Sequence, residues 1–182
     1  MEDIVRLNRC LFQPEDRQII LSQTGNLPHL SLLMCGLPVK RLETVKAKIR
    51  ALAASFCQFH LNIDKIVYRN ECTSLNIENM KDLRHLHETL IYAYSDYLAT
   101  TVTGSMFNHD TVISEASINY VNSYGDQGTR EHYWPHITLG YGKLPVDTRF
   151  PQVIGFDKIG LYHLGNHCTC SKNIFTTTLL SG

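Results

Sequence analysis

Two short segments of the chain alternate polar and apolar residues in the same order. Residues 27–33 are Leu-Pro-His-Leu-Ser-Leu-Leu, and residues 134–140 are Trp-Pro-His-Ile-Thr-Leu-Gly. A period of two is typical of a strand with one buried face and one polar face. We therefore predict strands at 27–35 and at 136–140. On the polar face of each, a histidine and a hydroxyl residue lie side by side.

The remaining pattern predicts two helices and further strands. Apolar residues recur at helical spacing over 39–56 and over 79–99, where Asn79 is the expected cap. Residues 102–117 are ambiguous, with a turn or helix start at 108–110, and residues 1–26 give no clear pattern. Strands are expected at 59–68, 72–77, 156–164 and 174–180, with a turn at Gly165-Asn166 and loops at 123–128 and 142–151.

The order of these elements indicates a weak duplication. Each half contains a motif strand, a connection, a strand, a turn and another strand. Antiparallel sheets with helices packed on one face of each make an α+β fold. With 182 residues, 43% of them hydrophobic, we expect a single domain covering residues 1–182 and built of two lobes.

The charge balance narrows the class of ligand. Seventeen basic residues match seventeen acidic ones, whereas proteins that bind duplex DNA usually carry a basic surplus. We expect a small or short ligand and not duplex DNA. No apolar run approaches the roughly 20 residues that span a bilayer, and the acidic N-terminus lacks a signal-peptide core. With six scattered cysteines read as reduced, we expect a cytoplasmic monomer without a membrane partner.

The repeated segments also carry the most informative chemistry. A single histidine on a strand is usually structural, because buried polar groups find partners. Two matching copies are different, since His29 and His136 facing a common cleft can serve as general base and general acid. Ser31 and Thr138 can donate hydrogen bonds to the non-bridging oxygens of a phosphate.

This pair of motifs resembles the 2H phosphoesterase superfamily, in particular the branch of 2′-5′ RNA ligases and 2′,3′-cyclic nucleotide phosphodiesterases. Residues 83–90 also resemble the central helix of the family, and residues 156–180 its closing hairpin. The resemblance implies two lobes about a pseudo-twofold axis, with the histidines in the groove between them. It further implies a phosphodiesterase that acts on a nucleotide or short RNA without metal or other cofactor, through His29, Ser31, His136 and Thr138.

Four further residues are candidates for substrate contact. Trp134 alternates onto the face of His136, where it can stack on a base or fill the core. Arg130 and Tyr124 belong to the loop that precedes the second motif; Arg130 can contact phosphate or remain a solvated charge. Tyr141 stands where many members of the family carry a basic residue, so it can replace that contact by stacking.

Two other interpretations remain open. His163, His167, Cys168 and Cys170 are suitable zinc ligands, although their spacing does not match common structural zinc patterns. Alternatively, the chain is a nucleotide- or RNA-binding module that keeps the fold without turnover. Neither the substrate nor the identity of the base is decided by the sequence: candidates are RNA 2′,3′-cyclic ends, small cyclic nucleotides, ADP-ribose cyclic phosphate and 2′-5′-linked oligonucleotides.

Overall fold

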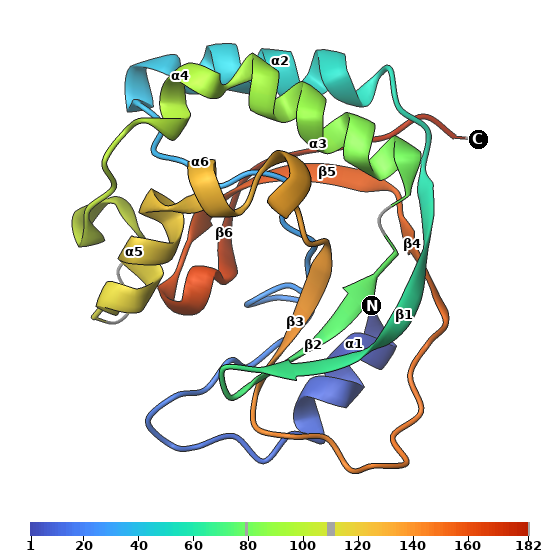
Figure 1. The fold of residues 1–182 in the computed structure, drawn as a ribbon. Coiled ribbons are helices and arrows are strands. Elements are labelled where there is room, and N and C mark those ends of the chain that lie inside the picture. Colours follow the sequence, from blue (N-terminus) through green and yellow to red (C-terminus); the bar gives the residue numbers. More distant parts are fainter. Residues whose placement is uncertain (79, 109–111, 182) are drawn as a thin grey trace.

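Helices and antiparallel strands build the chain, as the α+β prediction requires. The computed structural model describes residues 1–78, 80–108 and 112–181, and its named strands form two sheets. In Figure 1 one sheet occupies the lower half of the view, and the other lies above it, beneath the helices α2 and α3. The predicted α+β fold with two lobes is confirmed.

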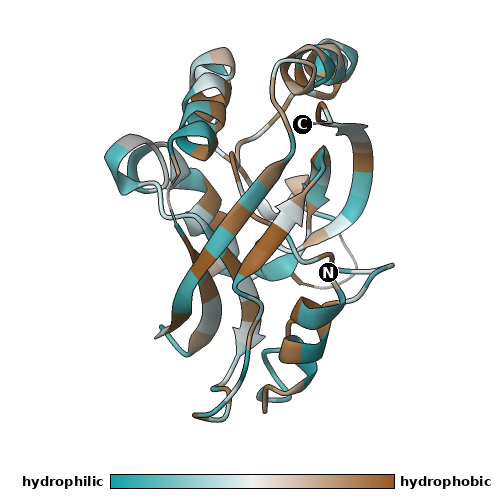
Figure 2. Cartoon of the chain, turned by 90° about the vertical axis from the view of Figure 1, so that its right-hand side faces the viewer, coloured by the Kyte–Doolittle hydropathy of each residue, from teal (hydrophilic) through white to brown (hydrophobic). Residues whose placement is uncertain are grey.

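The larger sheet has the strand order β3-β2-β1-β4 in the described chain, and every neighbouring pair is antiparallel. Figure 2 shows polar and apolar bands alternating along its strands. The last strand, β4, is not predicted as a separate element: it lies between the loop expected at 142–151 and the strand expected from 156. The strands are β1 (Phe59–Arg69), β2 (Cys72–Ile77), β3 (His136–Tyr141) and β4 (Val153–Phe156).

Helix α1 (Glu2–Arg9) packs on the apolar face of this sheet, although the N-terminal sequence gives no clear helical signal. Its eight residues contribute two almost fully buried side chains, Ile4 and Leu7. The buried Asn8 donates from Nδ2 to the carbonyl oxygens of Ile19 and Leu139, each at 2.6 Å. One polar side chain therefore joins the helix, the loop after it and β3.

The smaller sheet is the hairpin of β5 (Lys158–Leu164) and β6 (Cys170–Thr178). Helices α2 (Leu42–Ala53) and α3 (Lys81–Ala93) contribute to the apolar cluster on one of its faces. The hairpin is confirmed, but β6 begins four residues earlier than predicted.

A third apolar cluster joins shorter helices at the side of the molecule. The predicted loop at 123–128 is wrong, because the buried side chain of Tyr124 anchors a short helix there. The helix expected at 79–99 is interrupted at Tyr94, whose φ of −126° is not helical. The remaining helices are α4 (Ser95–Leu98), α5 (Glu115–Asn122), α6 (Tyr124–Gln127) and the 3₁₀ turns η1 (Val39–Arg41), η2 (Gly104–Met106), η3 (Arg130–His132) and η4 (Asn166–Cys168).

The strand predicted at 27–35 is wrong. In the described structure this segment has no regular secondary structure, bends at Leu32 and forms only one bridge, between Leu27 and Cys170 of β6. Alternation of polar and apolar residues reports which side chains are buried, and it does not report whether the backbone is paired. The expected cap Asn79 and two residues of the expected turn, His109 and Asp110, lie outside the described residues.

Within the described ranges, no helix is both long enough and apolar enough to cross a membrane.

Candidate active site

The second motif occupies β3, where His136 and Thr138 lie on one face and the buried residues Ile137 and Leu139 on the other. Nδ1 of His136 lies 2.8 Å from the carbonyl oxygen of Trp134. A carbonyl only accepts, so in the neutral ring Nδ1 carries the proton and Nε2 holds the lone pair. Nε2 is therefore the nitrogen that can accept or return a proton.

Trp134 stacks on this imidazole. The ring centroids are 4.2 Å apart and the planes differ by 20°. The indole Nε1 donates to Oδ1 of Asn76 on β2, and Nδ2 of Asn76 donates to Asp64 at 3.1 Å. Cross-strand partners share a face, which explains why Asn76, paired with His136, reaches this ring. Stacking of Trp134 on a substrate base stays a prediction, because in the structure the ring contacts His136.

The first motif repeats the same local contact on a different backbone. Nδ1 of His29 lies 2.9 Å from the carbonyl oxygen of Leu27, two residues earlier. In both motifs a proline separates the histidine from this carbonyl. Proline restricts the preceding residue to extended conformations and has no N–H of its own. The tripeptide X-Pro-His therefore orients both imidazoles in the same way, with Nε2 as the lone-pair nitrogen.

Two backbone carbonyls of the first motif accept hydrogen bonds from side chains and not from a neighbouring strand. Tyr133 donates its hydroxyl to the carbonyl of Ser31 at 3.4 Å, and Nδ1 of the fully buried His87 donates to the carbonyl of Leu32 at 2.7 Å. The rings of His87 and Tyr133 stack with centroids 3.7 Å apart and planes 7° apart. Since Tyr133 directly precedes the second motif, it joins the two motifs. No periodic signal marks either residue, because both contacts span more than 50 positions.

The two imidazoles interact electrostatically. Burial lowers the pKa of His29, the hydrogen bond to the Leu27 carbonyl opposes this shift, and a charge on His136 lowers the pKa of His29 further. Burial also lowers the pKa of His136, against the effect of the Trp134 carbonyl. A charge on His136 thus acts on His29, although the two histidines lie more than 100 residues apart in the sequence.

The two motif hydroxyls complete this arrangement. Ser31 and Thr138 are both half-buried, and neither side chain has a hydrogen-bond partner among the described residues. Each hydroxyl lies two residues after its histidine, so both remain available as donors to a ligand.

A β-bulge brings Tyr141 onto the face of His136. Residues on β2 that alternate in sequence share one face, and their partners on β3 lie on that face too. The pairs on this face are Asn76–His136, Ser74–Thr138 and Cys72–Tyr141. Leu139 is the extra residue that shifts the register, so Tyr141 joins the polar face. Simple alternation along the sequence would put it on the opposite face.

Tyr141 contacts residues from two distant parts of the chain. Its hydroxyl lies 3.0 Å from Nδ1 of His167 in η4, and the guanidinium of Arg17 lies 5.5 Å from its ring centroid. Arg17 is paired with Glu71 at 2.6 Å. Lys143 is the first basic residue after the second motif. Its Nζ lies over the ring of Tyr68, 4.6 Å from the ring centroid.

The other two predicted substrate contacts have different outcomes. Tyr124 is 4% exposed and packs in the third apolar cluster, and burial strongly raises the pKa of its hydroxyl. This environment supports a structural role for its side chain. Arg130 begins η3, but its side chain lies outside the described part of the structure.

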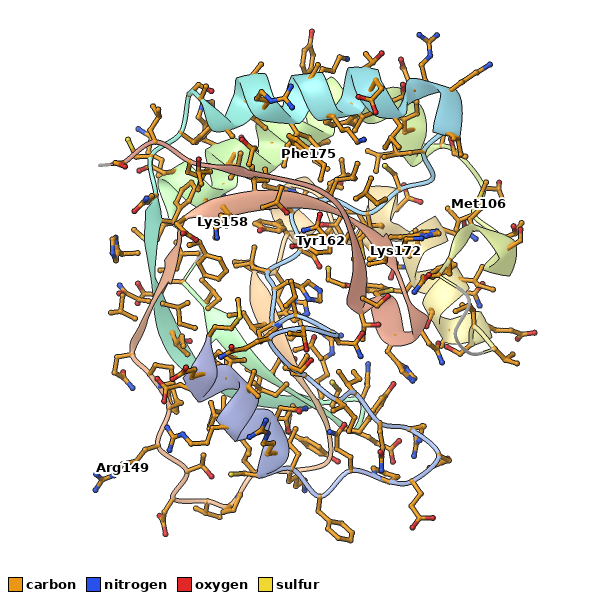
Figure 3. All side chains as sticks on the ribbon, turned by 180° about the vertical axis from the view of Figure 1, so that it is seen from behind. Met106, Arg149, Lys158, Tyr162, Lys172 and Phe175 are labelled. Atoms are coloured by element: carbon orange, nitrogen blue, oxygen red, sulfur yellow. The ribbon has the colours of Figure 1, made fainter. Side chains whose placement is uncertain are left out.

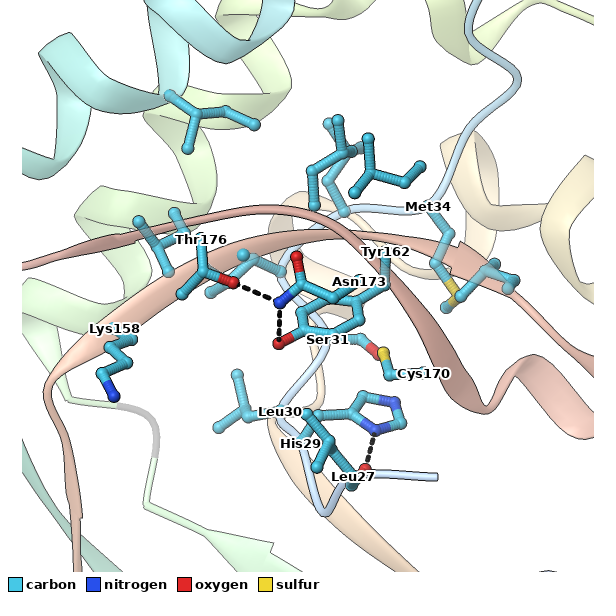
Figure 4. Close-up of a pocket in the computed structure, with 18 of the residues that line it drawn as sticks. Leu27, His29, Leu30, Ser31, Met34, Lys158, Tyr162, Cys170, Asn173 and Thr176 are labelled. Atoms are coloured by element: carbon cyan, nitrogen blue, oxygen red, sulfur yellow. Dashed lines mark hydrogen bonds between the residues drawn. The ribbon is translucent and has the colours of Figure 1, made fainter. Parts of the chain in front are cut away.

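A cavity of about 990 Å³ borders the first motif. Its lining includes His29, Ser31, residues of β5 and β6, and Ile137 from the apolar face of β3, whereas His136 and Thr138 are not among the lining residues. Figure 4 shows the imidazole of His29 in this cavity, with its bond to the Leu27 carbonyl. Small-molecule sites commonly occupy 300–1,000 Å³, so its volume suits a nucleotide.

The zinc interpretation finds no ligand set in the part of the chain that is described. No group of three or more histidine, cysteine or acidic side chains there is arranged to hold a metal ion. Nε2 of His163 lies 2.7 Å from the carbonyl oxygen of Met106, and Nδ1 of His167 lies near the Tyr141 hydroxyl.

Comparison with known proteins identifies the family to which the chain belongs. A search of curated proteins found no match. The chain is similar in fold to the crystal structure of TT0787 of Thermus thermophilus, with a TM-score of 0.54 and 17% sequence identity over 85% of this chain and 79% of that one. The protein-family model for the 2′-5′ RNA ligase superfamily matches residues 24–154, which include both X-Pro-His motifs. With more than half of its length matched, the chain belongs to the 2′-5′ RNA ligase superfamily of 2H phosphoesterases.

Proposed function

We propose that this protein is a metal-independent phosphodiesterase that cleaves a 2′,3′-cyclic phosphate or a 2′-5′ phosphodiester of a nucleotide or short RNA. One observation carries the proposal: His29 and His136 are oriented by the same X-Pro-His contact, and a charge on His136 reaches His29 and lowers its pKa. The superfamily supplies the substrate class, RNA or nucleotides.

In this mechanism one imidazole removes a proton from the attacking group, which is water or a ribose hydroxyl. The other imidazole protonates the departing ribose oxygen. Each transfer uses Nε2, because Nδ1 of each ring is bound to a backbone carbonyl. Ser31 and Thr138 donate to the non-bridging oxygens, where negative charge grows in the transition state.

For the hydrolytic direction, we infer the two roles from the unequal surroundings of the two imidazoles. The Trp134 ring lies over His136, and an aromatic face stabilises a nearby cation. In the described part of the chain no aromatic ring stacks on His29, and burial, together with a charge on His136, lowers the pKa of His29. The single proton that the pair carries between its two titrations therefore rests on His136. This makes His136 the general acid and His29 the general base.

The test is a panel of substrates assayed with EDTA present: RNA with a 2′,3′-cyclic end, adenosine 2′,3′-cyclic phosphate, ADP-ribose cyclic phosphate and 2′-5′-linked oligoadenylate. Native protein is compared with His136→Ala and with His60→Ala, whose imidazole is exposed on β1. We expect turnover of at least one substrate by the native protein and by His60→Ala, and a loss of about 10²-fold or more in His136→Ala. Product analysis identifies which ribose oxygen keeps the phosphate.

Two outcomes would contradict the proposal. Complete loss of turnover on chelation would show that a metal is required. Tight nucleotide binding without product from any member of the panel would favour the alternative, a binding module that keeps the fold.

A further inference from the structure

The cavity beside the first motif extends along the β5–β6 hairpin, and residues from both faces of β5 line it. Lys158, Gly160 and Tyr162 alternate along β5, so their positions share a face. Tyr162 lines the cavity, whereas Phe175 of β6 packs in the apolar cluster with α2 and α3. Figure 3 shows the labelled side chains of Tyr162 and Phe175 on opposite sides of the hairpin. No function has been assigned above to Tyr162 or to the residues on its side of the hairpin.

The Cε2 edge of the Tyr162 ring lies against the strand at Gly160. A Cβ atom placed on Gly160 would be 2.4 Å from Cε2 and 3.2 Å from Cζ of this ring. Such distances are far below van der Waals contact, so only glycine leaves room for the ring in this position. Tyr162 also lines the cavity.

Two polar residues of β6 fix the far end of the ring. Nδ2 of Asn173 donates to the Tyr162 hydroxyl at 3.2 Å and to Oγ1 of Thr176 at 2.5 Å. Figure 4 shows both bonds above Ser31 and His29. A ring held against the backbone at one end and by a hydrogen bond at the other loses little freedom when a ligand stacks on it.

Two of the four groups proposed to contact the phosphate lie in the same cavity as the Tyr162 ring. His29 and Ser31 line it together with Tyr162, Asn173 and Lys158. An imidazole and a hydroxyl suit a phosphate, and a flat ring suits a base. A ligand with both parts within one nucleotide length matches this arrangement.

We propose that Tyr162 is a stacking platform for the nucleobase of the substrate whose phosphate lies at His29 and Ser31. The proposal rests on the function proposed above and narrows it to substrates with a base next to the reacting phosphate. It disfavours cyclic phosphates on a ribose that carries no base. Asn173 positions the platform, and its Oδ1, which has no partner in the described chain, can accept a bond from the base edge.

Equilibrium binding tests this directly, without turnover. We would titrate adenosine 2′-monophosphate and 1-O-methylribose 2-phosphate, which lacks the base, into native protein and variants by calorimetry. Tyr162→Ala should weaken nucleotide binding roughly 10- to 100-fold, the usual range for one base stacked on an aromatic ring. Binding of the base-free compound should not change. Tyr92→Ala is the matched control, since Tyr92 is 88% exposed on α3.

Two further variants separate stacking from folding. Gly160→Ala keeps the tyrosine but forces its ring off the strand, so it should reproduce most of the loss. Tyr162→Phe keeps the ring and removes only the bond from Asn173, so the loss should be about threefold or less. Thermal melts of all variants report whether each one folds.

Equal affinity of native protein for the two compounds would overturn the inference, as would native-like nucleotide binding by both Tyr162→Ala and Gly160→Ala. The proposed function fails separately. If the variants lose nucleotide affinity but no phosphodiester in the panel is cleaved, the platform stands and the enzyme does not. If native protein and Tyr162→Ala cleave base-free and base-bearing cyclic phosphates with the same KM, the enzyme stands and the platform does not.

Discussion

The two motif segments place the same side chains on two different kinds of backbone. The second lies in β3, with cross-strand partners on β2, and its histidine is covered by Trp134. The first has one bridge to β6, and the side chains of Tyr133 and His87 hold its carbonyls. Yet His29 and His136 make the same contact to the carbonyl two residues earlier. Imidazole orientation is thus local, whereas the position of each segment depends on the fold around it.

We expect the largest effect on activity from removing each imidazole in turn, which tests whether the two motifs are equivalent. If the two motifs contribute one member each to a single acid–base pair, His29→Ala and His136→Ala should each lower kcat/KM by roughly 10²–10⁴-fold. The double variant should cost far less than the product of the two, because paired groups act as a unit. Steady-state kinetics on the best substrate of the panel measures this. Near-native activity in either single variant would show that the two motifs are not equivalent.

Removal of the hydroxyls should have the next largest effect. Ser31→Ala and Thr138→Ala each delete one donor to the non-bridging oxygens, which should lower kcat by about 10²-fold with a smaller change in KM. Ser31→Thr and Thr138→Ser keep the hydroxyl and should retain most of the activity. An equal loss in the alanine and the conservative variants would indicate a packing defect and not the loss of a donor.

The side chains that hold the first motif should matter for stability. His87→Leu removes the donor to the Leu32 carbonyl, so the free energy of unfolding should fall by about 1–3 kcal/mol at pH 8. Burial lowers the pKa of His87. Below about pH 6.5 the unfolded chain therefore binds this proton more readily, and native stability should fall as the pH drops from there.

Urea titrations at pH 8 and pH 5.5 check both statements. The difference between the two pH values should be smaller in His87→Leu than in native protein. Tyr92→Ala, at an exposed site on the same helix, supplies the control and should leave the difference unchanged.

The smallest expected effect concerns the unequal surroundings of the two histidines. Trp134→Leu removes the ring that stabilises protonated His136, a contribution of about 0.5–1 kcal/mol. The alkaline limb of the kcat/KM profile should therefore move down by roughly half a pH unit, and the acidic limb should stay in place. Because burial lowers the pKa of both histidines, the native optimum should lie below neutral pH. A shift of the acidic limb alone would reverse the assignment of acid and base.

Periodic segments of the sequence predict their structures well. Helix α2 and the strands β1 and β2 lie where the pattern predicts them, and β3 begins at His136. In these elements buried and exposed residues alternate with the period of a helix or a strand, so a short stretch of sequence is enough to predict the element. The repeated Pro-His is equally visible, because the contact it makes lies within one tripeptide.

Features that depend on residues far apart in the chain escape this kind of prediction. The missing ladder around His29 is filled by His87 and Tyr133, and the helix α1 is fastened through Asn8 to β3. The side of β3 on which Tyr141 lies depends on a register shift against β2, which alternation along one strand does not contain. Each of these requires knowledge of which elements are neighbours.

The X-Pro-His contact has a consequence for how such sites arise and how they can be built. The acceptor carbonyl, the restricting proline and the imidazole belong to three consecutive residues. Copying the few codons for this tripeptide therefore copies both the histidine and the contact that fixes its tautomer. Duplication of those codons can supply a second proton-transferring histidine even where the two copies lie in different secondary structures. The same tripeptide offers enzyme designers an aimed imidazole that requires only an extended stretch of host chain.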